Sequence, residues 1–125
     1  MTALLDTNGV LTLAALFPTA ARTATANGTA LDVRAMKGIA SIVLDSAAGT
    51  GTSPTMTVKI QDSADGSSGW ADISGATFTQ VTTTASLQKI GVDVDACAGY
   101  IRAVATIGGT TPSFTASVNL LARGF

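Results

Sequence analysis

The sequence predicts an all-β fold, an antiparallel β-sandwich of about eight strands. Short apolar segments recur with turn signals at intervals of about 8–12 residues, the spacing typical of a sandwich or barrel. Threonine, whose branched Cβ packs well on a pleated surface, is abundant along the chain. Two ten-residue segments also resemble each other and are called the repeated phrase below: 51–60 (GTSPTMTVKI) and 109–118 (GTTPSFTASV).

The repeated phrase predicts two related β-hairpins. In both copies a Gly/Thr turn meets a proline, Pro54 or Pro112, and the proline opens an alternating apolar and polar run. Proline is tolerated at the first residue of a strand but not in its middle, so each copy is expected to be a turn that launches a strand. An apolar strand precedes each turn, at 39–45 and at 100–107. The prediction is therefore a sandwich with related halves.

The first third of the chain predicts an arm, a strand and a hairpin. Residues 1–9 are expected to form an N-terminal arm ending in an Asn8-Gly9 turn, and residues 10–125 the sandwich domain. Residues 10–17 predict a strand stopped by Pro18, with a short helix as the competing prediction because alanine and leucine are good helix formers. Residues 22–33 predict a hairpin around the two-residue loop Asn27-Gly28.

The remaining strands follow from apolar runs and alternation. Residues 39–45 are almost continuously apolar, as expected of a strand covered on both faces. Residues 46–55 read as a long loop of small residues. In 56–61 the alternation places Met56, Val58 and Ile60 on the inner face. Residues 62–69 read as a turn-rich loop, and the other expected strands are 70–73, 77–81, 87–94, 100–107 and 113–122.

Composition argues against several classes of partner. Charged residues make up 12% of the chain, about half the share typical of soluble domains, and the net charge is −1. The seven basic residues are scattered, which argues against a protein that binds nucleic acid directly. No segment approaches the roughly 18 apolar residues of a membrane span, and no signal peptide is recognised, so synthesis in the cytoplasm is expected. A weakly charged surface predicts a chain that partners cover.

Residue types needed for catalysis are scarce. The chain has no histidine, and all eight acidic residues are aspartates. Asp93 and Asp95 would share a face of a strand, as a catalytic or metal-binding pair requires, but the same spacing fits a strand that ends in a turn. Cys97 is the single cysteine, so no internal disulfide can form, and its apolar setting predicts a buried thiol. We expect no enzyme, no cofactor and no bound metal.

Three further features admit two interpretations each. Residues 62–67 (DSADGS) resemble calcium-binding loops faintly, and the same residues cap tight turns by bonding their own backbone. Trp70 and Tyr100 could form a carbohydrate-binding platform, although packing in the core is the favoured role. The glycine-rich segments 49–52 and 108–111 lack the following helix of a phosphate-binding loop and are expected to be hairpin tips.

Residues 58–67 (VKIQDSADGS), 70–73 (WADI) and 99–106 (GYIRAVAT) are similar to small structural proteins of tailed bacteriophages. The resemblance extends over about residues 20–122, and these are strand-and-turn phrases rather than a functional signature. It implies a virion component, in particular a capsid decoration (cement) protein with a jelly-roll-like sandwich. Such proteins commonly sit as trimers on the outer face of the head and clamp neighbouring major capsid subunits. The family carries no catalytic residues.

These observations predict a protein of the capsid surface whose partners are the major capsid protein and further copies of itself. The arm is expected to order only against a neighbour. Two alternatives remain: a tail, head–tail connector or fibre-base subunit, and a glycan-binding module. The candidate partner contacts lie in the arm and in the two Gly/Thr segments: Leu4, Leu5, Asp6, Val10, Thr50, Thr52, Thr110 and Thr111.

Overall fold

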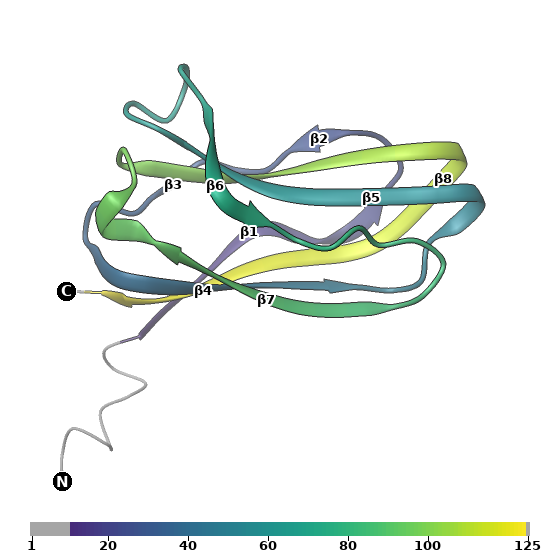
Figure 1. Cartoon of the computed structure of the whole chain (residues 1–125), viewed down its shortest axis with the longest axis horizontal. Helices are drawn as coiled ribbons and strands as arrows, with labels where there is room; N and C mark the ends of the chain where they lie inside the picture. The colour runs from purple at the N-terminus through teal and green to yellow at the C-terminus, as the bar shows by residue number, and fades with distance from the viewer. Residues whose placement is uncertain (1–10, 125) are drawn as a thin grey trace, which may run out of the picture.

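A computed structural model of the chain describes residues 11–124, and these residues form antiparallel strands with short connections (Figure 1). The predicted all-β antiparallel sandwich is confirmed. Within this part of the chain no helix has the length and apolar character to cross a membrane. The elements are β1 (Leu11–Arg22), β2 (Ala26–Asn27), β3 (Leu31–Asp32), β4 (Met36–Ser46), β5 (Thr50–Ser63), β6 (Ala71–Thr77), β7 (Ser86–Asp93), the 3₁₀ turn η1 (Val94–Ala96) and β8 (Tyr100–Gly124).

The strands form two layers that share their longest strand. Sheet A has the order β1-β8-β4-β7, and sheet B places β2 and β3 beside β8, followed by β5 and β6. The second part of β8 belongs to sheet A and the first part to sheet B. β4 and β5 follow it as successive antiparallel partners, from Met36 opposite Gly124 to Ser63 opposite Tyr100. The sandwich is therefore a long ribbon of strands bent once, at the right of Figure 1.

The bend is made by the two copies of the repeated phrase, and the prediction of two hairpins is wrong. The segments Gly51–Pro54 and Gly109–Pro112, called the corner below, lie side by side, with Thr52 opposite Thr110. Their backbones match: the glycines have φ of 105° and 112°, and Ser53 and Thr111 have φ of 49° and 48°. Each copy has the positive φ of a turn, but its hydrogen-bonded partner is the other copy instead of the strand before it.

The glycines of the corner allow the two copies to approach each other. A Cβ on Gly51 would lie 2.5 Å from the Thr111 carbonyl oxygen, and one on Gly109 would lie 2.7 Å from the Ser53 carbonyl oxygen. Because the corner is part of the ladder, the long loop predicted at 46–55 is also wrong, and β5 begins at Thr50.

The hairpin predicted around Asn27-Gly28 does not form. β2 and β3 do not pair with each other, since each pairs with β8. Gly28 donates its amide hydrogen to the Ala103 carbonyl at 2.7 Å, and a Cβ there would lie 2.5 Å from the carbonyl oxygen of Leu16. The glycine therefore serves a close backbone approach rather than a two-residue turn.

The strand predicted at the start of the domain is confirmed, and the competing helix is not. β1 pairs with β8 from Leu11 opposite Arg123 to Arg22 opposite Phe114. The expectation that Pro18 stops this strand is wrong. Pro18 lies within the second of two register shifts, between Phe17 and Ala20, in an edge strand where a missing amide hydrogen is tolerated. The predicted arm and the domain boundary after residue 9 lie outside the described residues.

Two further strand boundaries differ from the predicted ones. Of the strand expected at 77–81, only Thr77 belongs to β6, and Val81 forms an isolated bridge with Met56. The strands expected at 100–107 and 113–122 are one strand, β8, which continues through the corner.

Alternate residues of each strand build one core between the two layers. The predicted inner positions Met56, Val58 and Ile60 are fully buried. Sheet A supplies a matching set of buried side chains, which includes Ala40, Ile42, Leu44, Phe114, Val118 and Leu120. Both layers thus cover each other with one face and leave the other face outward.

The connections at the end opposite the corner cross between the sheets. Residues 33–35 lead from β3 in sheet B to β4 in sheet A, and residues 94–99 lead from β7 in sheet A to β8 in sheet B. The two crossings are joined by a hydrogen bond from the Val33 amide to the Gly99 carbonyl at 2.9 Å. This end, at the left of Figure 1, is the open end of the sandwich.

Candidate docking surface

The outer face of sheet A carries large apolar side chains that the described chain leaves uncovered. Leu13, Ile39 and Leu87 are 73%, 67% and 74% exposed, and Leu121 is 39% exposed. The register brings them onto one face: Leu13 lies opposite Leu121, which lies opposite Ser41, and Ile39 and Leu87 stand on the neighbouring strands β4 and β7. We call these four residues the apolar face.

Single exposed apolar residues are common on protein surfaces, whereas several gathered on one face mark an interaction site. The apolar face is a candidate for such a site because each strand of sheet A (β1, β8, β4 and β7) contributes a member. Leu87 lies opposite Asp45, farther along the face toward the corner than the other three. Gly91 of β7 adds no side chain, and a Cβ there would lie 2.9 Å from the Ile39 side chain. The Ile39 side chain therefore lies over Gly91, in space that a larger residue at position 91 would partly fill.

A hollow of about 340 Å³ lies at one end of the apolar face. Both apolar and cationic side chains line it, and below we call it the cationic hollow. Lys37 lies opposite Arg123 in the ladder between β4 and β8, so the two cations stand on neighbouring strands. The lining residues are Lys37, Gly38, Ile39, Ser41, Leu121 and Arg123.

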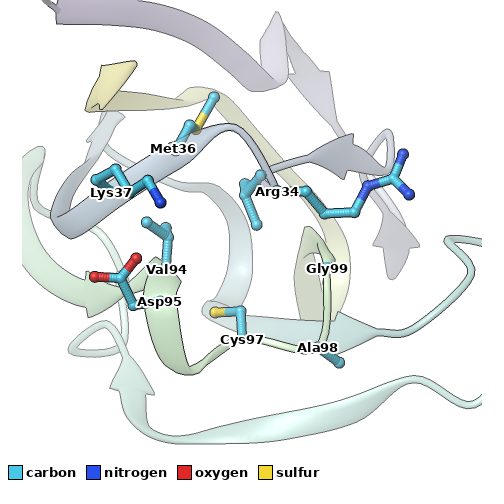
Figure 2. A pocket seen from close by; sticks show the side chains of 9 residues that line it. Arg34, Met36, Lys37, Val94, Asp95, Cys97, Ala98 and Gly99 are labelled. Carbon is cyan, nitrogen blue, oxygen red and sulfur yellow. The ribbon is translucent and has the colours of Figure 1, made fainter. Parts of the chain in front are cut away.

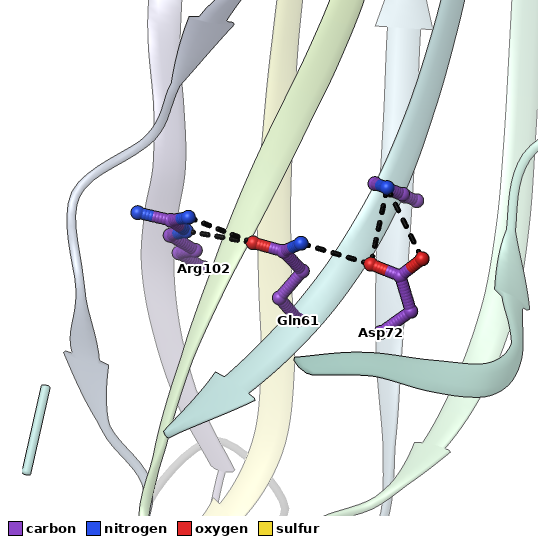
Figure 3. Close-up of polar contacts among 4 residues, drawn as sticks. Gln61, Asp72 and Arg102 are labelled. Carbon is purple, nitrogen blue, oxygen red and sulfur yellow. Dashed lines mark hydrogen bonds and ion pairs between the residues drawn. The ribbon is translucent and has the colours of Figure 1, made fainter. Parts of the chain in front are cut away.

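The outer face of sheet B is polar and satisfies its own groups (Figure 3). The Asp72 carboxylate accepts hydrogen bonds from Gln61 Nε2 at 2.8 Å and from Lys59 Nζ at 3.1 Å. Gln61 Oε1 in turn accepts two bonds from the Arg102 guanidinium, at 2.8 and 3.0 Å. The hydrogen bond from Gln61, followed by that from Lys59, lowers the pKa of Asp72. We call these four residues the polar face.

The two aromatic side chains considered for a glycan platform are each covered by an arginine. The Arg102 guanidinium lies 4.4 Å from the centre of the Trp70 ring, and that of Arg34 lies 5.1 Å from the Tyr100 ring. Both rings are half-buried at the surface, so the favoured prediction that they pack in the core is wrong. A sugar that stacked on Trp70 from that side would have to displace a cation–π contact.

The aspartate-rich loop uses its carboxylate to hold its own backbone, as the turn interpretation predicts. Asp65 accepts hydrogen bonds from the amides of Ser67 and Ser68, each at 2.9 Å, and from the hydroxyl of Ser68 at 3.1 Å. These bonds, the Ser67 amide first, hold the pKa of Asp65 well below its ordinary value. Gly66 has a φ of 77°.

Asp93 and Asp95 serve a turn, as one of the two interpretations predicts. Asp93 accepts the Asp95 amide hydrogen at 3.0 Å and so caps η1, while Asp95 accepts the Gly38 amide hydrogen at 3.0 Å. Within residues 11–124 no group of three or more acidic or cysteine side chains is placed to hold a metal ion.

A second hollow, of about 230 Å³, lies at the open end beside Cys97 (Figure 2). Lys37 and Asp95 line it as well, whereas the Arg34 guanidinium points away from the other labelled side chains. Cys97 is half-buried rather than fully buried. Desolvation first, and then the charges of Asp62 and Asp93, raise the pKa of the Cys97 thiol to about 11. The thiol is protonated at neutral pH and is a poor nucleophile.

Of the predicted partner contacts, the four threonines meet at the corner. Thr50, Thr52, Thr110 and Thr111 are all exposed there, at the end of the molecule opposite the cationic hollow. The other four, Leu4, Leu5, Asp6 and Val10, lie outside the described residues. Sequence reasoning missed the apolar face because it assigned the outward residues of β4 to a strand covered on both sides.

No protein-family profile matches the sequence, and no curated protein matches it. Among solved structures, the chain is similar to a chain in "Structure of infectious bursal disease virus Gx strain", with a TM-score of 0.49, 10% identity and 90% of this chain covered. It is also similar to a chain in "Crystal structure of infectious bursal disease virus VP2 subviral particle", with a TM-score of 0.47, 11% identity and 91% covered. The chain spans only 31% and 32% of those two chains. At these scores the two likenesses carry no inference about function.

Proposed function

We propose that this chain is a non-enzymatic structural protein of a virion. In its most specific form the proposal is a bacteriophage capsid decoration protein, which binds the outer face of the head and stabilises contacts between major capsid subunits. One observation carries it: the apolar run at 39–45 has the composition of a strand covered on both faces, yet its outer face is uncovered in residues 11–124. A neighbouring subunit would supply the second cover.

Burial of the apolar face against a neighbour is energetically favourable. Apolar surface removed from water contributes about 25 cal/mol per Å², so a contact centred on four large aliphatic side chains contributes several kcal/mol before the cost of association. Repeated over many sites of a shell, a modest affinity per site still reinforces the whole.

The difference between the two outer faces supports attachment from one side. The polar face pairs its own charges and amides, as Figure 3 shows, and needs no partner. Residues 11–124 give the apolar face no such cover. A protein that coats a shell needs this asymmetry, with one face toward the shell and the other toward water.

The arrangement of titratable groups supports a role without catalysis. The carboxylates of Asp65 and Asp93 hold backbone amides of their own loops, and that of Asp95 holds the Gly38 amide of β4. The thiol of Cys97 is kept protonated. A nucleophile, a base and an orienting group do not come together in the described residues.

The proposal is tested by mixing the purified protein with DNA-filled heads that lack tails, with isolated tails as the parallel sample. We expect the native chain to sediment with the heads, and a variant with Leu13→Ser, Ile39→Ser and Leu87→Ser to remain in the supernatant. An Arg102→Ser variant, changed on the polar face, should bind like the native chain.

Binding to tails alone would contradict the cement proposal and favour a tail or connector subunit. Binding to cell-surface glycan that Trp70→Ala abolishes would contradict a virion role.

A further inference from the structure

We propose that the cationic hollow receives the segment Leu4-Leu5-Asp6 of a second copy of this chain. The carboxylate of Asp6 would lie between Lys37 and Arg123, and the two leucines would lie against the exposed side chains of the hollow. This inference rests on the proposed role of the apolar face as an assembly surface, and it names the partner at one end of that face.

The hollow has the chemistry to bind a carboxylate that adjoins apolar side chains. Lys37 and Arg123 lie opposite each other in the ladder, and both are exposed. Ile39 and Leu121 line the same hollow of about 340 Å³ and are likewise open to solvent. A pair of cations beside two aliphatic side chains favours a segment with the opposite charge and a matching apolar part.

The two cations have no ion-pair partner within residues 11–124. The ion pairs formed there are Arg34 with Asp32 and Lys59 with Asp72, both away from the hollow. Asp93 lies opposite Ile39 in the ladder, but its carboxylate caps η1. Asp95, beside Lys37 at the open end, accepts the Gly38 amide hydrogen. Each of these two carboxylates holds a backbone amide, and neither forms an ion pair with Lys37 or Arg123.

The chain itself contains a segment of the required chemistry. Among its eight aspartates, Asp6 alone follows two consecutive leucines. It precedes Leu11, which pairs with Arg123 at the end of sheet A, by five residues. Five residues span at most about 17 Å when extended, enough to reach an adjacent molecule.

A segment of this chemistry can link one copy of the chain to another. Leu11 lies opposite Arg123, which lines the hollow, in the first described row of the ladder between β1 and β8. Each copy carries both the segment and the hollow, so copies can join through this contact. The test below separates that link from occupation of the chain's own hollow.

The test is a charge-swap mixing experiment on the full chain, followed by sedimentation velocity over a range of concentrations. We expect the native chain to associate as concentration rises. Asp6→Lys alone should be monomeric, and so should Lys37→Asp with Arg123→Asp, because each places like charges together. A mixture of these two chains should associate again, since the reversed segment of one fits the reversed hollow of the other. A Lys59→Asp control, changed on the polar face of sheet B, should associate like the native chain.

Several results would overturn the proposal. If the single variants associate like the native chain, the segment and the hollow are not partners. A chain that carries Asp6→Lys, Lys37→Asp and Arg123→Asp together provides a further comparison. If this chain sediments like the native chain but the mixture does not associate, the segment occupies the hollow of its own molecule. Binding to heads distinguishes failure of this inference from failure of the proposed function. If heads bind the native chain but not the Leu87→Ser variant, the apolar face is still the assembly surface, and only the inferred occupant of the hollow is wrong.

Discussion

Two glycines at the corner show how single residues permit the bend of this sandwich. Gly51 and Gly109 combine φ above 100° with a carbonyl oxygen of the other copy within 2.7 Å of where a Cβ would stand. Either feature alone disfavours an ordinary side chain, and here both occur together. The requirement is reciprocal, because each glycine makes room for the backbone of the other copy.

We predict that Gly51→Ala and Gly109→Ala each lower the free energy of unfolding by at least about 2 kcal/mol, the cost of a strained backbone conformation together with a steric clash. Gly75→Ala is the matched control, because Gly75 has a φ of 77° but a Cβ added there would meet no atom within 4 Å. Its cost should be about 1 kcal/mol, the backbone part alone. Urea denaturation measures all three, and equal losses would show that the close approach at the corner is unimportant.

The aspartates that hold loops determine the response to acid. Hydrogen bonds from Ser67 and Ser68 lower the pKa of Asp65, and those from Arg34 lower the pKa of Asp32 to about 2. A carboxylate whose pKa is lower in the folded state stabilises that state above the unfolded pKa, and the contribution is lost as pH falls through the folded pKa. Stability should therefore decrease from about pH 4 downward.

We expect Asp65→Asn to flatten this acid dependence, because an amide does not titrate. Thermal unfolding between about pH 4 and pH 2 should show a smaller fall in Tm for this variant than for the native chain. Asp45→Asn serves as the control, since Asp45 makes no side-chain hydrogen bond within residues 11–124. An equal fall for Asp65→Asn and the native chain would mean that the loop bonds do not persist in solution.

At the scale of elements, β8 organises the molecule. It pairs with β1, β2 and β3 along one edge and with β4 and β5 along the other, so both layers depend on it. Alternate residues of the strand have opposite environments: Phe114 is fully buried between the layers, and Leu121 lies on the apolar face.

We predict that Phe114→Ala lowers the free energy of unfolding by about 3–5 kcal/mol, as expected when a large buried side chain leaves a cavity. Leu121→Ala on the same strand should cost no more than about 1 kcal/mol, because its side chain is partly open to water. Chemical denaturation of both variants checks the difference. A large loss for Leu121→Ala would place it in the core and remove it from the apolar face.

The sequence predicts the elements of this fold better than their pairing. Alternation in Met56, Val58 and Ile60 correctly identifies an inner face, because that signal is local to one strand. The glycines at Gly28 and Gly51 are misread as hairpin turns, because a glycine required by a close neighbour looks the same in the sequence as one required by a turn. The difference lies in the partner strand, 75 or 60 residues away at Ala103 or Thr111, which no local pattern reveals.

At the scale of the whole molecule, the two outer faces have different surface chemistry. Sequence alternation alone cannot locate the apolar face, since Ile39 reads as a core residue within an apolar run and is 67% exposed in the fold. The sequence does contain the correct signal, which is that this strand requires cover on both sides. Only the three-dimensional arrangement shows that residues 11–124 cover one face of this strand and leave Ile39 on the other face exposed.

The central claim is that the apolar face becomes buried on assembly and the polar face does not. Hydroxyl-radical footprinting of the free protein and of assembled particles tests it most directly, by comparing side-chain oxidation at Leu13, Ile39 and Leu87 with that at Trp70. We predict strong protection of the three aliphatic residues in the particle and unchanged oxidation of Trp70. Protection of Trp70 with no change at Leu13, Ile39 and Leu87 would contradict the account.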